Sequence, residues 1–105
     1  MPLRIVFTAT AEKDVDETID YISIDNPVAA ESMAGRIEQT IRLLAERPHL
    51  GRPAPETGQT GMRRLPVPPY VVFYFAAEDT LEIVRILHGA RQLDDHRLYD
   101  ASGID

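Results

Sequence analysis

Arginine is the residue type with the greatest capacity for chemistry in this sequence. The chain carries ten arginines and a single lysine, Lys13. A guanidinium group pairs with carboxylates and phosphates through two parallel hydrogen bonds, but it is too basic to act as a general base. The basic residues therefore suit recognition of an anionic group better than abstraction of a proton.

Two of these arginines, Arg63 and Arg64, are neighbours in a predicted strand over residues 61–67. Adjacent side chains on a strand point to opposite faces of the sheet. We expect one of the two to face an open side of the sheet and contact a partner, and the other to pair with a carboxylate of a helix. A solvated pair on an edge strand is the alternative, since exposed ion pairs contribute little.

Arg85 lies between Val84 and Ile86 in the most apolar predicted strand. A buried charge without a partner is too costly to be maintained. The sequence therefore predicts a structural ion pair between Arg85 and an acid, such as Asp20 or Glu17 of the first helix.

The three histidines, His49, His88 and His96, offer a second route to chemistry. His88 ends the last predicted strand, where we favour a hydrogen-bonded structural role over a catalytic one. Asp94, Asp95 and His96 have the side-chain types of a metal site, but consecutive residues diverge around the backbone and seldom converge on one ion. We predict neither a metal nor a cofactor.

Charge is unevenly distributed along this chain, whose formal net charge is −6. A generic nucleic-acid binder is usually a basic domain, so the balance argues against that class. Acids crowd residues 11–31, and arginines follow in the middle of the chain: Glu12, Asp14, Asp16, Glu17, Asp20, Asp25 and Glu31, then Arg36, Arg42, Arg47, Arg52, Arg63 and Arg64. We interpret the acids as a solvated helix face; the rival interpretation is contact with a basic partner.

Hydrophobic periodicity sets the first two elements. Residues 3–8 are rich in β-branched and aromatic side chains, which predicts a strand. Apolar residues then recur at intervals of three and four over residues 11–24, which predicts an amphipathic helix with Thr10 as its N-cap.

A second helix should follow almost at once. Pro27 suits the first helical position, and Asp25 or Asn26 can accept the amide hydrogens that lack partners there. The apolar stripe continues to about residue 47, before Pro48. The short connection makes the two helices an antiparallel hairpin.

Three strands should complete the chain after a loop over residues 48–60. The strand signals cover residues 61–67, 70–76 and 80–88, and their short links predict an antiparallel meander. Pro66 cannot donate to a ladder, so the first strand of the meander should be an edge. Two of the four aromatic residues on strand 70–76 should be core: Tyr70, Phe73, Tyr74 and Phe75 alternate there.

These elements predict an α+β fold in β-α-α-β-β-β order. The expected architecture is a mostly antiparallel twisted sheet with the helical hairpin on one face and the other face available to partners. The 105 residues fit one domain spanning 1–105, with a flexible tail at about 98–105. The chain has no cysteine, no apolar run long enough for a membrane and no apparent signal peptide, so we expect a cytoplasmic protein that does not associate with a membrane.

The order of several short motifs resembles the ParE/RelE superfamily of toxins from type II toxin-antitoxin modules. No motif is specific alone, but their combination is, and it is closer to the ParE (plasmid stabilisation) branch. The motifs are Asp25-Asn26-Pro27, then Pro48-x-x-Gly51-Arg52, then Gly61-x-Arg63-Arg64-Leu65 and finally the run RILHGAR at residues 85–91.

The resemblance implies the same fold, growth inhibition, and neutralisation by a cognate antitoxin of the ParD-like, ribbon-helix-helix DNA-binding kind. ParE-like members inhibit DNA gyrase without cutting nucleic acid, whereas RelE-like members are ribosome-dependent mRNA endoribonucleases. We favour the gyrase inhibitor, which is not an enzyme, and its partner-binding residues are then expected to be Arg63, Arg64, Arg85, His88 and Arg91.

The RelE-type alternative would need a catalytic set. The candidates in this chain are Arg64, Arg91 and His96, but the lysines that RelE-like enzymes carry near the end of the second helix are missing. A third possibility is an antitoxin-binding protein with feeble toxicity. In all three cases we expect the antitoxin to add against the helical hairpin and a sheet edge, with its acids near Arg63, Arg64 and Arg91.

Overall fold

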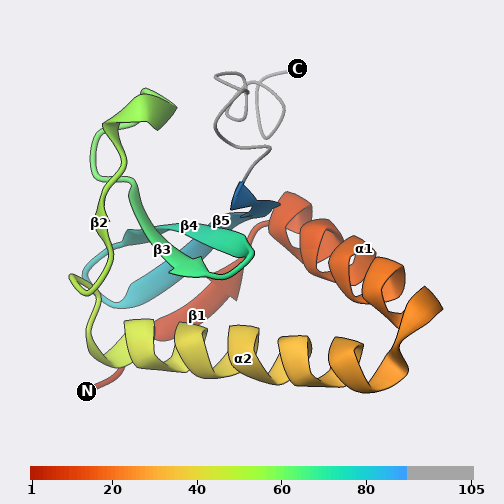
Figure 1. Cartoon of the computed structure of the whole chain (residues 1–105). Coiled ribbons are helices and arrows are strands. Elements are labelled where there is room, and N and C mark those ends of the chain that lie inside the picture. The colour runs from red at the N-terminus through yellow and green to blue at the C-terminus, as the bar shows by residue number, and fades with distance from the viewer. Residues whose placement is uncertain (90–105) are drawn as a thin grey trace.

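A five-stranded sheet carries a hairpin of two helices on one face (Figure 1). The computed structural model describes residues 1–89. It confirms the predicted α+β class and the element order, with one short strand added in the loop. The elements are β1 (Arg4–Phe7), α1 (Ala9–Asp25), α2 (Pro27–Glu46), β2 (Arg52–Pro53), the 3-10 helix η1 (Pro55–Thr57), β3 (Arg63–Val67), β4 (Tyr70–Ala76) and β5 (Thr80–His88).

Side-chain caps determine where both helices begin. The Thr8 side chain accepts a hydrogen bond from the Ala11 amide, so α1 begins two residues earlier than predicted, and Thr10 as the cap was wrong. Asn26 accepts from the Ala29 amide, and Pro27 occupies the first position of α2, as predicted. Since Asn26 alone separates α1 from α2, the two helices form a tight hairpin.

The strands lie in the order β1-β5-β4-β3-β2. β1 runs parallel to β5, and all the other pairs are antiparallel. The predicted edge position of β3 was wrong along part of its length, because β2 pairs with Arg63 and Arg64. Pro66 lies beyond this two-residue pairing, where no ladder hydrogen bond to β2 is required of it. β1 and β2 are therefore the edges of the sheet.

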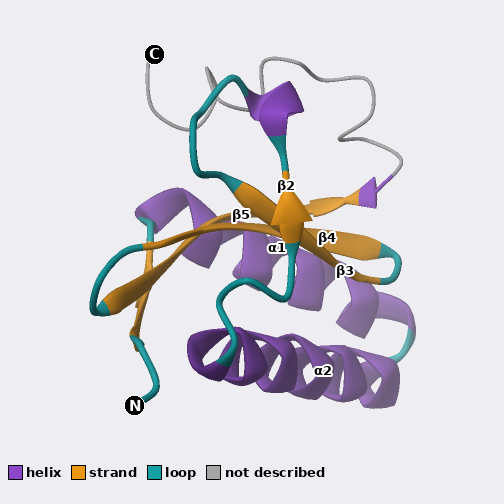
Figure 2. Cartoon of the chain, turned by 90° about the vertical axis from the view of Figure 1, so that its left-hand side faces the viewer, coloured by secondary structure: helices purple, strands orange, loops and turns teal. Residues whose placement is uncertain are grey.

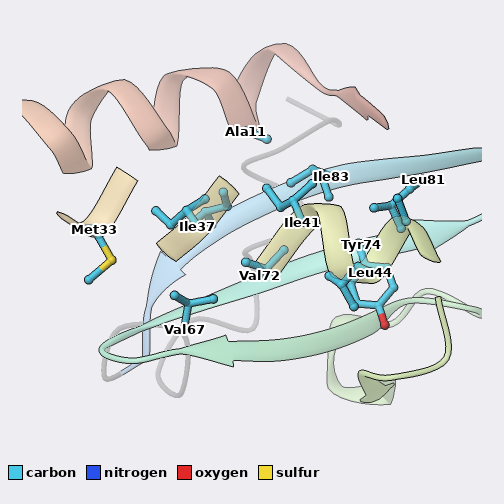
Figure 3. Packing of buried hydrophobic residues seen from close by; sticks show 12 residues of the cluster. Ala11, Met33, Ile37, Ile41, Leu44, Val67, Val72, Tyr74, Leu81 and Ile83 are labelled. Carbon is cyan, nitrogen blue, oxygen red and sulfur yellow. The ribbon is translucent and has the colours of Figure 1, made fainter. Parts of the chain in front are cut away.

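The main core fills the space between the helical hairpin and the sheet (Figure 3). Its buried members come from both helices and from β3, β4 and β5: Ala11, Met33, Ile37, Ile41, Leu44, Ala45, Val67, Val72, Tyr74, Leu81, Ile83 and Ile86. Among residues 1–89, no helix is long and apolar enough to cross a membrane.

A second, smaller core lies on the opposite face of the sheet. Ala54 and Met62, from the connection between β2 and β3, pack there with the sheet residues Val71, Phe73 and Val84. Figure 2 shows the helices on one side of the sheet and the turn after β2 on the other. The prediction of an open second face was therefore wrong in part, because residues 54–62 cover some of it. Phe73 and Tyr74 are the two aromatic residues of β4 that are fully buried.

Candidate functional site

Arg63 and Arg64 point to opposite faces of β3, as adjacent strand residues must. Arg63 pairs in register with Tyr74, which lies in the main core, whereas Arg64 pairs with Phe73 of the second core. The Arg63 guanidinium donates to the Gly51 carbonyl oxygen at 2.6 Å. Neither arginine pairs with a carboxylate of the two predicted helices: Arg63 binds a backbone carbonyl, and Arg64 pairs with Glu56 of the short 3-10 helix η1.

The Tyr74 side chain holds together the turn between α2 and β2. Its hydroxyl accepts from the Gly51 amide at 2.9 Å and donates to the Pro48 carbonyl at 2.8 Å. Burial raises the pKa of the Tyr74 phenol above its usual range, despite the opposing effects of the Gly51 hydrogen bond and the Arg63 charge. A Cβ at Gly51 would lie 2.5 Å from the Tyr74 hydroxyl, so only glycine fits. The close approach of the Tyr74 hydroxyl therefore explains the glycine at position 51.

Arg64 is held on the second face of the sheet. It donates to Glu56 at 2.8 Å, and its guanidinium carbon lies 5.8 Å from the centre of the Phe73 ring. Burial alone would raise the pKa of Glu56, but hydrogen bonds from its own backbone and from Arg64, together with the charges of Arg64 and Arg52, hold it below the usual range. The Arg64 side chain is thus fixed by residues of its own chain.

The predicted ion pair between Arg85 and an acid of the first helix is confirmed, and the acid is Asp14 rather than the two examples named, Asp20 and Glu17. The Arg85 Nε donates to Asp14 at 2.8 Å, and the two side chains are only 12% and 10% exposed. Asp14 also accepts from the Ile86 backbone amide at 3.0 Å. The Asp14 carboxylate therefore accepts a hydrogen bond from the backbone of β5, beyond the residues of β5 that pair with β1. This position supports a structural role for Arg85.

The remaining predicted site residues lie at the end of β5 or after it. His88 makes an edge-to-face contact with Tyr70, with ring centres 5.5 Å apart. Arg91 and His96, and with them the Asp94-Asp95-His96 run and the tail, lie outside the described residues. Among residues 1–89, no three His, Asp or Glu side chains are grouped so that they could hold a metal ion.

An apolar groove lies along the β1 edge of the sheet, which is the edge opposite to β2. Its volume is about 390 Å³, and its lining residues come from β1 and both helices: Ile5, Phe7, Val15, Ala34, Ile37, Glu38, Ile41 and Arg42. Glu38 and Arg42 form an exposed ion pair at 2.6 Å. Beside the groove, β1 has β5 as its only strand neighbour within residues 1–89. The sequence showed the apolar stripe of α2 but not that part of it would remain accessible next to β1.

The groove and the pair Arg63–Arg64 are far apart in the sheet. β5 and β4 separate β1 from β3, which amounts to roughly 14 Å at about 4.8 Å per strand. A partner seated beside β1 therefore does not place its acids near these arginines unless it crosses the sheet. The groove at β1 and the two arginines of β3 are therefore separate features of the sheet.

These features describe an α+β domain with an apolar groove at one edge of its sheet, and the comparisons with known proteins identify its class. The family described as "ParE toxin of type II toxin-antitoxin system, parDE" matches residues 5–93. The chain therefore belongs to the ParE toxin family, within the ParE/RelE superfamily of type II toxin-antitoxin toxins.

Individual relatives agree with this assignment. The chain is 42% identical to Toxin RelE2 of Caulobacter vibrioides over 89 residues, which cover 84% of this chain and 97% of the relative. It is 35% identical to Putative toxin Y4kP of Sinorhizobium fredii over 89 residues, covering 85% and 91% of the two chains.

Two solved structures share the fold at low sequence identity. A chain from the chromosomal ParDE toxin-antitoxin system of P. aeruginosa has a TM-score of 0.68 and 22% identity, over 82% of this chain and 95% of that one. A chain of the toxin-antitoxin complex RelBE2 of Mycobacterium tuberculosis has a TM-score of 0.60 and 22% identity, over 84% and 99%. The predicted fold and superfamily are therefore confirmed.

Proposed function

We propose that this toxin stops growth by binding DNA gyrase in the cytoplasm, without covalent chemistry, and that a cognate antitoxin neutralises it. One observation carries the proposal. Arg63 and Arg64 are turned to opposite faces and are held by Gly51 and Glu56 of the same chain. A nuclease needs cations converging on one phosphate, beside a group that takes a proton.

The lysine content points the same way. Lys13, the only lysine, lies on the exposed side of α1 with its Nζ 4.0 Å from Glu17. It is thus remote in sequence from the end of α2, where RelE-like enzymes carry theirs. The choice of gyrase as the target rests on the resemblance to the ParE branch and on the family match.

We place the antitoxin at the groove beside β1. An unpaired strand edge accepts an extended segment through main-chain hydrogen bonds, and a neighbouring apolar groove takes its alternate side chains. Ile5 and Phe7 of β1 line the groove from the sheet side, and Ile37 and Ile41 line it from α2. The antitoxin is expected to be a ParD-like ribbon-helix-helix protein encoded by a short reading frame just upstream.

A pair of variants tests this placement. Ala34→Glu puts a carboxylate into the mostly apolar groove, where it loses hydration and lies one helical turn from Glu38, whose charge it repels. Ser32→Glu adds the same charge at an exposed position of α2 that does not line the groove. We expect Ala34→Glu to weaken antitoxin binding by roughly tenfold or more in calorimetry, with Ser32→Glu close to wild type. Equal affinities for the two variants would place the antitoxin elsewhere.

Induction in cells tests the toxic function. Expression without the neighbouring gene should stop growth and leave plasmids relaxed or linearised, and co-expression of the neighbour should prevent both effects. Growth arrest with normal plasmid supercoiling would contradict gyrase as the target.

The RelE-type endoribonuclease is the second candidate, because the Caulobacter relative at 42% identity is named Toxin RelE2. Arg64, Arg91 and His96 would then be its catalytic residues. Toeprinting of translated messages after induction decides between the two. Cuts at the ribosomal A site that disappear in Arg91→Ala would favour the nuclease.

A further inference from the structure

Three large apolar side chains are exposed at the tip of the helical hairpin. Tyr21 and Ile24 belong to the last turns of α1 and Val28 to the first turn of α2, and they are 75%, 79% and 75% exposed. In Figure 1 this tip lies at the right, beyond the strands and on the opposite side of the view from β2. We call Tyr21, Ile24 and Val28 the tip cluster.

The tip cluster has no evident role in folding. The stripe of α1 that packs against the main core consists of Val15, Ile19 and Ile22, so Tyr21 and Ile24 project from other sides of the helix. None of the three residues of the cluster lines the groove at β1. Tyrosine in particular anchors protein interfaces, because it brings a large rigid apolar area with a polar end.

Carboxylates surround the tip cluster. Glu17 and Asp25 lie four residues before and after Tyr21, and Asp20 lies four residues before Ile24, so each is a neighbour on the helix surface. Glu31 follows Val28 by three residues. The sequence contains no lysine or arginine between Lys13 and Arg36. The tip is therefore an apolar patch within a negative field.

This combination selects one kind of partner. Phosphate backbones are repelled by such a field, so the tip does not bind nucleic acid. A second copy of the chain would bring the same acids against each other, which disfavours a symmetric contact. A protein surface with an apolar recess bordered by Lys and Arg would bury the exposed apolar side chains of the tip and attract its carboxylates.

We propose that the tip cluster is the surface through which the toxin contacts its target, and that the contacted region of the target is a cationic protein surface with an apolar recess. The inference rests on the proposed toxic function and adds to it the contact surface. An enzyme that holds DNA carries such cationic surfaces, because it must neutralise phosphates. The target and the antitoxin then occupy different parts of the toxin.

The test compares the full chain with two sets of variants. Tyr21→Ser/Ile24→Ser/Val28→Ser removes the apolar anchors, and Asp20→Asn/Asp25→Asn/Glu31→Gln removes three of the four surrounding charges. Leu43→Ser/Leu50→Ser is a control for loss of surface apolar side chains, since these leucines are 41% and 45% exposed and lie away from the tip. Each protein is assayed for binding to the antitoxin, for binding to purified gyrase and for growth inhibition on induction.

We expect the apolar triple variant to bind gyrase roughly 30-fold or more weakly and to lose toxicity, while its affinity for the antitoxin stays within about twofold of wild type. The charge variant should bind gyrase more weakly at low salt and show a smaller salt dependence. The leucine control should behave as wild type in all three assays.

The remaining outcomes separate the two proposals. If the wild type is toxic but does not bind gyrase, while the apolar triple variant is harmless, the gyrase target fails and the tip as contact surface stands. If the triple variant remains fully toxic, or loses antitoxin binding as well, the tip proposal is overturned. A folded wild type that binds antitoxin and leaves growth unchanged overturns both.

Discussion

Replacing Asp14 by alanine tests the internal contact that connects α1 to β5. The Asp14 carboxylate accepts from Arg85 Nε at 2.8 Å, from Arg85 Nη2 at 3.2 Å and from the Ile86 amide at 3.0 Å. Thr8 adds a further contact by donating its hydroxyl to the Val84 carbonyl at 3.0 Å. Asp14→Ala removes three hydrogen bonds and the negative charge in one step.

The expected loss is large for a single substitution. Removing one partner of a largely buried ion pair costs about 3–5 kcal/mol. Since both side chains keep a little solvent exposure, at 12% and 10%, we expect the lower end, about 3 kcal/mol. A domain of this size has a total stability of about 5–15 kcal/mol, so the variant should fold but melt well below wild type.

Urea unfolding measures this difference directly. Asp14→Asn retains an acceptor for the Ile86 amide but loses the charge, and it should lie between alanine and wild type. The control is Asp16→Ala, an exposed acid on the same helix, which should change stability by less than about 0.5 kcal/mol. A loss of under 1 kcal/mol for Asp14→Ala would refute the structural role that we assign to the pair.

Three further predictions concern the segment between α2 and β3. Tyr74→Phe leaves the buried Gly51 amide without its acceptor, so the free energy of unfolding should fall by about 1–3 kcal/mol, measured by urea titration; an unchanged midpoint would contradict the contact. Gly51→Ala places a Cβ 2.6 Å from the Arg64 carbonyl oxygen and should lower the stability of the fold at least as much as Tyr74→Phe does, as measured by thermal melting. Gly35→Ala is the control, because open space surrounds that position, and it should not lower the melting temperature. The pKa of Glu56 lies below its ordinary value of 4.5 in the folded chain. Its ionised form therefore stabilises the fold above that pH, and this contribution is lost as the pH falls through the lowered pKa. Glu56→Gln should reduce the difference in the free energy of unfolding between pH 7 and pH 3, by less than about 1 kcal/mol because the Glu56–Arg64 pair is partly exposed.

Much of the fold follows from local signals in the sequence. The β-branched and aromatic runs at residues 70–76 and 80–88 predict strands whose bounds match β4 and β5. Asn26 and Pro27 define the turn between the helices, because cap chemistry is local. β2 has only two residues and forms because Tyr74 and Arg63 hold Gly51 in place, contacts that no local pattern contains.

The candidate site was less predictable, because it depends on which residues meet across the fold. A bulge between Phe73 and Tyr74 shifts the register of β4 against β5, so strict alternation along the strand does not give the environment of Arg85. The choice of Asp14 over Asp20 or Glu17 depends on where α1 crosses β5. The exposure of Tyr21 and Ile24 was not foreseen either, although both fall outside the apolar stripe of α1.

A reaction with purified components tests the central claim most directly. Antitoxin-free toxin is added to gyrase, ATP and relaxed plasmid, and supercoiling is followed on a gel. Binding of gyrase predicts a dose-dependent loss of supercoiling or the accumulation of linear DNA after protease treatment, both reversed by the antitoxin. Full supercoiling at a large excess of folded toxin, together with cutting of ribosome-bound mRNA by the same preparation, would contradict the account.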